Sequence, residues 1–316
     1  MTTRSALILG AGVSGLTTAV RLLDAGFSVR VWGKDLPPAT TSNVAAAFWY
    51  PYQVEPPDRV ARWAADSFAV FETLAAQPET GVVRRLAIEI GPPRDRPAWS
   101  RVLADYRDAA PDELPPGRAR GSAFTSFVIE TPRYLPWLIG QIQARGGVVE
   151  RRAVDDLDAA ARAADLVVVC AGLGAAALAR DAELSPLRGQ LVRVANPGLT
   201  RVVVDEEGPE ITYIVPRRDD CVLGGSAEPG CYDTAADPAL TRAILARCVA
   251  IEPRLRGATL LGVDVGLRPC RTSVRLERAA DAPARIYNYG HGGAGVTLSW
   301  GCAAEVRELA ARACPP

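Results

Sequence analysis

Residues 6–9 read ALIL, and the run GAGVSG follows at once at positions 10–15; this stretch decides the fold of the first part of the chain. The four apolar residues predict a short buried strand. Apolar residues at helical spacing over 16–23 predict a helix behind the glycine-rich turn. A second strand is predicted over 28–32. Strand, turn, helix and strand form a βαβ unit of about thirty residues, the setting in which such a turn binds a dinucleotide.

The glycine-rich turn predicts where a dinucleotide would lie. Glycine lets the backbone approach a pyrophosphate without a clash from Cβ, and the amides at the start of the helix favour that anion. The residues that we assign to this contact are Gly10, Gly12, Val13, Ser14 and Gly15. An acidic residue that binds the ribose is expected after the second strand, where the chain reads Lys34-Asp35; both residues remain candidates. A tight turn that binds nothing is the alternative.

The composition argues against several classes of function. The 316 residues carry 36 basic and 36 acidic side chains, so no net charge draws the protein to nucleic acid or to an anionic membrane. Seven scattered cysteines without a Cys-x-x-Cys pair and a single histidine predict reduced thiols and no metal site. The first residues lack the apolar stretch of a signal peptide, no apolar run predicts a membrane span, and the last residues carry no Ser-Lys-Leu signal. We therefore expect a cytoplasmic protein.

The rest of the chain predicts an α/β (α+β) protein with two interleaved domains. Four short strands between 189 and 226 predict a mostly antiparallel sheet. We assign residues 1–55, 131–185 and 262–316 to a Rossmann-like nucleotide-binding domain, and residues 56–130 and 186–261 to a substrate-binding domain. Helices are predicted over 59–76, 131–145, 238–251 and 298–313, further strands over 148–149, 166–170, 259–268 and 286–289, and short strands and loops up to 130.

Three further segments make the nucleotide-binding pattern more specific. Residues 40–52 read TTSNVAAAFWYPY, residues 266–271 read GLRPCR, and residues 287–297 read YNYGHGGAGVT. With the glycine-rich turn, in this order and spacing over nearly the whole chain, they resemble the D-amino-acid oxidase family, which includes D-aspartate oxidase. The resemblance implies that the cofactor is FAD and that the nucleotide-binding domain is an FAD-binding domain.

The resemblance also implies which residues contact FAD. Glycines in the third segment allow close approach, and the helix that follows would stabilise negative charge on the reduced flavin ring. The hydroxyl groups implied at the phosphates are those of Thr40, Thr41 and Ser42, and the residues implied along one flavin face near N5 are Val44, Ala45, Ala46 and Ala47. The residues implied beside the flavin N1 and C2 carbonyl are Gly295, Val296 and Thr297. Further implied FAD contacts are Gly292, Gly293 and Gly172, with Val154 near the adenine.

Substrate contacts follow from the same resemblance. Arg271 matches the family arginine that binds the substrate carboxylate, for which a guanidinium with two parallel donors is well suited. Tyr213 matches the tyrosine that shares this carboxylate, and the Gly293 carbonyl would accept a hydrogen bond from the substrate amine. His291 is expected to have a structural role. The expected walls of the side-chain pocket are Phe48, Tyr50 and Val215.

The implied activity is oxidative deamination of D-amino acids, in which a hydride passes from the substrate Cα to the flavin. The products are a 2-oxo acid, ammonia and hydrogen peroxide, and no acid–base residue of the protein is required. Members that prefer acidic substrates carry an arginine after a Leu-Gly-Gly turn, whereas this chain reads Ser226-Ala227 there, so neutral or apolar side chains are expected. D-Aspartate stays open as a substrate, because Arg217 or Arg218 could reach an acidic side chain. The short segment 205–210 predicts a reduced active-site lid.

Other interpretations remain open. One is a glycine or N-methyl amine oxidase of the same fold, and another is an NAD(P)-dependent dehydrogenase, against which the second and third segments argue. A non-catalytic flavin-binding module is an alternative from a different class. The expected partners are a D-amino acid and O₂, and a homodimer is left open.

Overall fold

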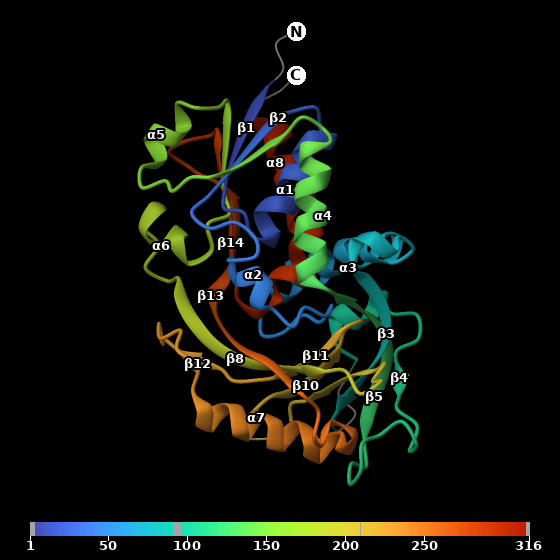
Figure 1. Cartoon of the computed structure of the whole chain (residues 1–316). Coiled ribbons are helices and arrows are strands. Elements are labelled where there is room, and N and C mark those ends of the chain that lie inside the picture. Colours follow the sequence, from blue (N-terminus) through green and yellow to red (C-terminus); the bar gives the residue numbers. More distant parts are fainter. Residues whose placement is uncertain (1–3, 92–95, 209, 314–316) are drawn as a thin grey trace.

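The computed structural model describes residues 4–91, 96–208 and 210–313. Its strands join in one large sheet, in the order β4-β5-β3-β9-β10-β11-β8-β13-β14-β7-β1-β2-β6, with β12 paired to β8. The sheet has a parallel part around β1 and a mostly antiparallel part around β10. In Figure 1 the parallel part lies in the upper half and the antiparallel part in the lower half.

The parallel part contains the predicted βαβ unit. Strand β1 (Ser5–Leu9) lies between β2 (Ser28–Gly33) and β7 (Leu166–Val169), and α1 (Val13–Asp24) connects β1 to β2. Successive residues of β1 point to opposite faces, and both faces are buried, as expected of a parallel strand. Parallel pairs extend this part with β6 (Val148–Arg151) and β14 (Arg285–His291), and α4 (Thr131–Gln143) and α8 (Gly295–Ala313) pack on α1.

The antiparallel part confirms the prediction for residues 189–226. Its strands are β8 (Ser185–Ala195), β9 (Val202–Asp205), β10 (Thr212–Pro216) and β11 (Asp220–Gly224). Helix α7 (Pro238–Ile251), predicted with the same bounds, packs on β8, β10 and β11 and forms the bottom layer of Figure 1. The sheet continues through β3 (Val82–Ile90), β5 (Gly121–Ile129) and β4 (Arg107–Asp108), and β12 spans Glu228–Pro229.

Strand β13 (Leu260–Arg278) joins the two parts. It pairs with β8 over its first half and with β14 over its second, and Figure 1 shows it running from the lower to the upper half. The sequence predicted only residues 259–268 as strand, because a proline at 269 and polar residues after it interrupt the apolar pattern. Pairing with a partner on each side overrides this local signal. The same reason explains β3 and β5, which have nine residues each where short strands were expected.

The smaller elements are mostly short connections. Helix α3 is the exception: its 18 residues pack against α8. The remaining bounds are α2 Thr41–Val44, α3 Pro57–Leu74, α5 Leu157–Ala161 and α6 Ala175–Leu178, with 3₁₀ helices at Pro78–Thr80, Ala98–Val102, Gly172–Gly174, Pro253–Leu255 and Gly292–Ala294.

Three further properties concern the described residues only. Their six cysteines are free, while Cys314 lies outside the described part of the chain. They contain no group of His, Cys, Asp or Glu side chains placed to hold a metal ion. None of their helices is long and apolar enough to cross a membrane. The division into two domains at the boundaries given above stays a prediction.

Candidate active site

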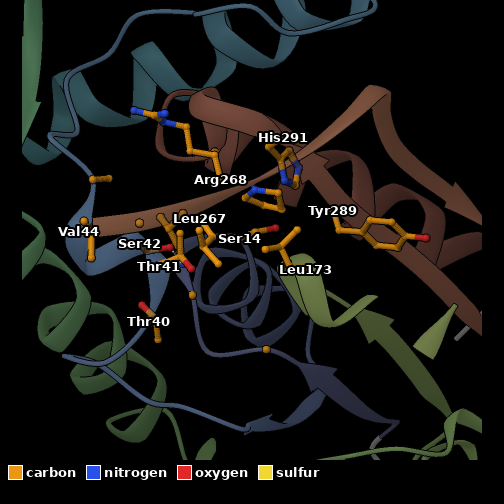
Figure 2. Close-up of a pocket in the computed structure, with 18 of the residues that line it drawn as sticks. Ser14, Thr40, Thr41, Ser42, Val44, Leu173, Leu267, Arg268, Tyr289 and His291 are labelled. Atoms are coloured by element: carbon orange, nitrogen blue, oxygen red, sulfur yellow. Dashed lines mark hydrogen bonds between the residues drawn. The ribbon is translucent and has the colours of Figure 1, made fainter. Parts of the chain in front are cut away.

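A cavity of about 910 Å³ is lined by most of the segments that the sequence singled out. It begins at the turn between β1 and α1, follows residues 38–48, and ends between β10, β13 and the start of α8. Figure 2 shows Thr40, Thr41 and Ser42 on one side of this space and Arg268, His291 and Tyr289, from β13 and β14, on another. Its volume lies in the usual range for small-molecule sites.

The glycines of the first turn let the backbone segments beside the cavity pack closely. A Cβ on Gly10 would lie 2.2 Å from the Cys170 carbonyl oxygen, and its φ of +119° also favours glycine. Gly12 is the N-cap of α1 and has no side chain that could cap the helix, and a helix N-terminus favours an anion. Gly15 does not line the cavity: a Cβ there would meet the Gly10 carbonyl oxygen at 1.9 Å, so its role is close packing of helix and turn.

The hydroxyl segment lies against the same helix end. Ser42 Oγ accepts a hydrogen bond from the Val13 amide at 3.0 Å, which joins two segments that are 29 residues apart. Thr40 and Asn43 form a capping box at the start of α2. Thr40, Thr41 and Ser42 all line the cavity, as do Ser14 and residues 44–47, so the structure brings these predicted contacts together.

One end of the cavity is shaped like a site for an adenosine group. Trp32, Val154 and Leu173 provide apolar walls, and the Arg152 guanidinium lies 3.8 Å above the Trp32 ring. Lys34 and Asp35 both line this end, although Asp35 Oδ1 also lies 3.7 Å from Arg151. Gly172, another predicted contact, lines it as well and has a left-handed φ of +53°. Which of Lys34 and Asp35 would meet a ribose stays open.

The start of α8 closes the cavity at the other end. The predicted residues Gly292, Gly293, Gly295, Val296 and Thr297 all line it. His291 Nε2 lies 3.0 Å from Asn288 Oδ1, and complete burial lowers the pKa of His291 to about 4. The ring is therefore neutral near pH 7 and donates to an internal partner, which fits the expected structural role.

Arg268 is the cation that faces this end of the cavity. Its guanidinium lies directly above Gly189, where a Cβ would come within 2.4 Å of both terminal nitrogens, and its Nη1 donates to the Ser226 carbonyl at 3.0 Å. It also hydrogen-bonds the Tyr213 hydroxyl, whose pKa is raised by burial against the opposing effect of Arg268. No ion pair among the described residues involves Arg268, so its charge is available to an anion in the cavity.

Arg271, which the sequence placed at the substrate carboxylate, does not line the cavity. Its Nε donates to Asp181 Oδ2 at 3.0 Å and its Nη2 to Glu183 Oε1 at 3.1 Å. Asp181 also accepts from Arg275 and from Tyr289. Arg271 lies three positions after Arg268, and an odd offset on a strand puts the two side chains on opposite faces. The guanidinium of Arg271 is thus already occupied by carboxylates.

The pocket walls agree with the sequence in part. Phe48 and Tyr50 line the cavity with stacked rings 5.3 Å apart, whereas Val215 is fully buried in the core and does not line it. The Tyr50 hydroxyl lies 2.9 Å from Glu89 Oε1 and 3.1 Å from Glu206 Oε1, and burial, followed by these carboxylates, raises its pKa. Tyr50 also borders a second cavity of about 260 Å³.

Comparisons with known proteins settle the family. Residues 5–309 match the family model described as FAD dependent oxidoreductase. The chain is 49% identical to a D-amino-acid oxidase of Rubrobacter xylanophilus over 98% of its own length and 96% of that protein. It is 42% identical to a D-amino-acid oxidase of Streptomyces coelicolor, over 96% of each chain.

The chain belongs to this family of FAD dependent oxidoreductases. Its fold is similar to that of a glycine oxidase from Geobacillus kaustophilus, with a TM-score of 0.80 at 20% identity over 98% of this chain and 95% of the other. That likeness concerns the fold alone.

The residues of the cavity fit FAD, the cofactor of this family. Two helix N-termini, those of α1 and α8, reach the same cavity, and an N-terminus favours negative charge. A pyrophosphate would be held at α1, where the N-cap Gly12 has no side chain and the hydroxyl groups of residues 40–42 line the cavity.

Sequence reasoning missed several residues that line the cavity, above all Arg268. The signal was present, since residues 266–271 contain two arginines and the sequence alone does not say which faces inward. Tyr52 was also missed; it contacts the same region, and burial raises its pKa while Arg268 lowers it. Further lining residues that it missed include Gly189, Leu191, Val204, Ile211 and Ser226.

Proposed function

We propose that this protein is an FAD-dependent oxidase of D-amino acids with neutral or apolar side chains, acting on the CH–NH₂ group with O₂ as acceptor. The products are a 2-oxo acid, ammonia and hydrogen peroxide. The identity to proteins named D-amino-acid oxidase supports this proposal. The observation that carries it is the Arg268 guanidinium, which faces the cavity beside the Tyr213 hydroxyl and has no carboxylate partner in the described structure.

Arg268, in place of Arg271, binds the substrate carboxylate in this proposal. Two terminal nitrogens on one side of a planar guanidinium match the two oxygens of a carboxylate. Tyr213 adds a neutral hydroxyl, since burial keeps its pKa raised. Gly293, next to Tyr52 and to the Arg268 side chain, offers its carbonyl to the substrate amine. Two fixed groups then orient the Cα hydrogen, which supports selection of one enantiomer.

FAD, when bound, supplies the electron acceptor for the hydride from the substrate Cα. The protein contributes orientation and exclusion of water, so no catalytic acid or base is assigned. Phe48, Tyr50 and Ile211 form an apolar wall beside Arg268 and Tyr213. The predicted short lid, 205–210, contains one residue outside the described ranges, and its effect on product release stays a prediction.

A neutral side chain fits the cavity better than the carboxylate of D-aspartate. The cationic residues that line it are Arg268 and, at the adenosine end, Lys34 and Arg152. Arg217 and Arg218, which kept an acidic substrate open, do not line it: Arg217 donates to the carbonyls of residues 45 and 46, and Arg218 lies near Glu130. No second cation of the described residues is therefore placed for a side-chain carboxylate.

A peroxide-release assay over D- and L-amino acids tests the proposal. Neutral D-amino acids such as D-alanine are expected to release peroxide and bleach the flavin absorbance without O₂, while L-enantiomers do neither. Rapid oxidation of D-aspartate would favour the D-aspartate oxidase alternative, and rapid oxidation of sarcosine with inert D-alanine would favour the N-methyl amine oxidase. A yellow protein that no amine bleaches would indicate a non-catalytic flavin-binding module. A colourless protein that takes up no flavin would overturn the proposal.

We also propose a cytoplasmic location, which the free cysteines support because disulfides are rare in a reducing compartment. Fractionation of cells that express the protein at its native level tests this. A homodimer remains untested.

A further inference from the structure

Arg217 is a buried cation that the substrate site does not use. It follows β10, its exposed fraction is only 5%, and it lies behind the wall that residues 44–47 form along the cavity. Its Nη2 donates to the Ala45 carbonyl at 2.7 Å and to the Ala46 carbonyl at 3.2 Å. A single guanidinium nitrogen thus bridges two successive peptide groups.

The burial of this charge is costly and is not offset by an ion pair. Burial lowers the pKa of Arg217, against the opposing effects of Asp220 and Glu130. Both carboxylates pair elsewhere, Asp220 with Arg193 and Glu130 with Arg133, and none of the ion pairs between described residues includes Arg217. Its Nε is buried and has no hydrogen-bond partner in that part of the chain. The arginine side chain stays protonated even so.

The two peptide groups held by Arg217 point their N–H groups the other way. In a planar trans peptide the carbonyl and the following N–H are opposed, so a carbonyl turned to Arg217 directs the next amide away from it. The amides concerned are those of Ala46 and Ala47, and both residues line the cavity. None of the hydrogen bonds within the described residues engages either amide. The Ala47 carbonyl is held as well, by the Ile129 amide at 2.7 Å.

We propose that Arg217 is a positioning residue for the flavin. By holding the carbonyls of Ala45 and Ala46, it orients the Ala46 and Ala47 amides toward the flavin ring, and its positive charge polarises these two peptide groups. This inference rests on the proposed function, in which residues 44–47 lie along the flavin. A carbonyl that accepts from a cation polarises its peptide, which makes the opposed N–H a stronger donor. Reduction places negative charge on the ring, so the arrangement stabilises reduced flavin more than oxidised flavin.

The test separates the charge of Arg217 from its hydrogen bonds. Arg217→Lys keeps the positive charge and one donor nitrogen, and one nitrogen is enough because both carbonyls accept from Nη2 alone. Arg217→Gln keeps a donor nitrogen but removes the charge. The matched control is Arg218→Gln, which changes the neighbouring arginine, whose side chain is 43% exposed. The measurements are the FAD dissociation constant of the apoprotein, the flavin reduction potential, and the unfolding temperature of the apoprotein.

Arg217→Gln is expected to lower the reduction potential and to weaken FAD binding by about tenfold, because the two carbonyls keep a donor but lose the positive charge beside them. Arg217→Lys is expected to keep the potential of the wild type, and Arg218→Gln to change neither quantity. A wild-type potential in Arg217→Gln, or an equal fall in the Lys and Gln variants, would overturn the inference. A lower unfolding temperature with unchanged potential would also overturn it, since it indicates a structural role. If the wild type itself binds no FAD or oxidises no D-amino acid, the proposed function fails instead.

Discussion

Arg268 and Arg271 lie on one strand, three residues apart, and have opposite surroundings. The Arg268 guanidinium stands over Gly189 with a hydroxyl, a carbonyl and an open cavity around it. That of Arg271 is held between Asp181 and Glu183. Burial would raise the pKa of Asp181, but the hydrogen bond from Tyr289 and the charge of Arg271 outweigh it and hold the pKa below its usual value.

The difference shows that a guanidinium can bind an anionic ligand when no carboxylate of the protein pairs with it. Glycine at 189 gives the guanidinium a flat backbone surface to lie on, while its neighbours contribute neutral acceptors. A carboxylate at the same distance would have neutralised it, as Asp181 does for Arg271. The first three of the following predictions test this contrast between the two arginines, and the fourth tests the buried histidine beside the same cavity.

Replacing Arg268 has the largest expected effect. Arg268→Met removes the charge that the proposal assigns to the substrate carboxylate, so binding should weaken by about 2–5 kcal/mol, as on truncation of one partner of a buried charge pair. The KM for D-alanine would rise by about 30-fold or more. Steady-state kinetics check this, with Arg271→Met as the matched control. Equal losses in both variants would remove the distinction between the two arginines.

A methyl group under the Arg268 guanidinium should have a smaller effect. In Gly189→Ala the new Cβ would lie 2.4 Å from both terminal nitrogens, so the guanidinium must shift. Misplacement of a binding group by about 1 Å costs on the order of 100-fold in rate, and we expect a fall of kcat/KM up to that size. Gly140→Ala, in α4 with no atom within 4 Å of its Cβ, is the control and should keep full activity. Normal kinetics in Gly189→Ala would show that the guanidinium is not fixed there.

Arg271 should matter for stability and not for substrate binding. Arg271→Met removes one of the three side-chain donors to Asp181 Oδ2, an oxygen of a carboxylate whose side chain is only 4% exposed. Loss of a hydrogen bond to a buried charged group costs about 1–3 kcal/mol of unfolding free energy. Urea unfolding measures this, and the KM for D-alanine is expected to stay at its wild-type value. A raised KM with unchanged stability would return the substrate site to Arg271.

His291 should give the smallest effect, visible only in acid. Its pKa is about 4 in the folded protein and 6.5 when exposed, so the unfolded chain binds the proton more readily. The contribution of neutral His291 to the stability of the folded protein is fully present above pH 6.5 and is lost as the pH falls from 6.5 to about 4. The unfolding temperature of the wild type should therefore fall more steeply over this range than that of His291→Gln. Parallel curves would show that the pKa of His291 is the same in the folded and unfolded states.

Much of the fold followed from the local sequence. The βαβ unit was predictable because its hydrophobic spacing is regular, and α7 was predicted with its observed bounds because aspartate and proline mark its start. The long strands β3, β5 and β13 were underestimated, since their length depends on partners far away in the chain. The same holds for Gly15 and Val215, which were assigned to the site and serve packing instead.

The sequence by itself determined which segments surround the cavity, because glycines, hydroxyls and helix starts act through the local backbone. The tertiary structure decided which arginine faces the cavity, because that choice depends on the register of β13 against β8 and β14 and on carboxylates from another segment. It also decided the place of Arg217, whose carbonyl partners lie more than 170 residues earlier in the chain. The charge of a side chain follows from the sequence, but whether that charge is paired depends on the residues that the fold places next to it.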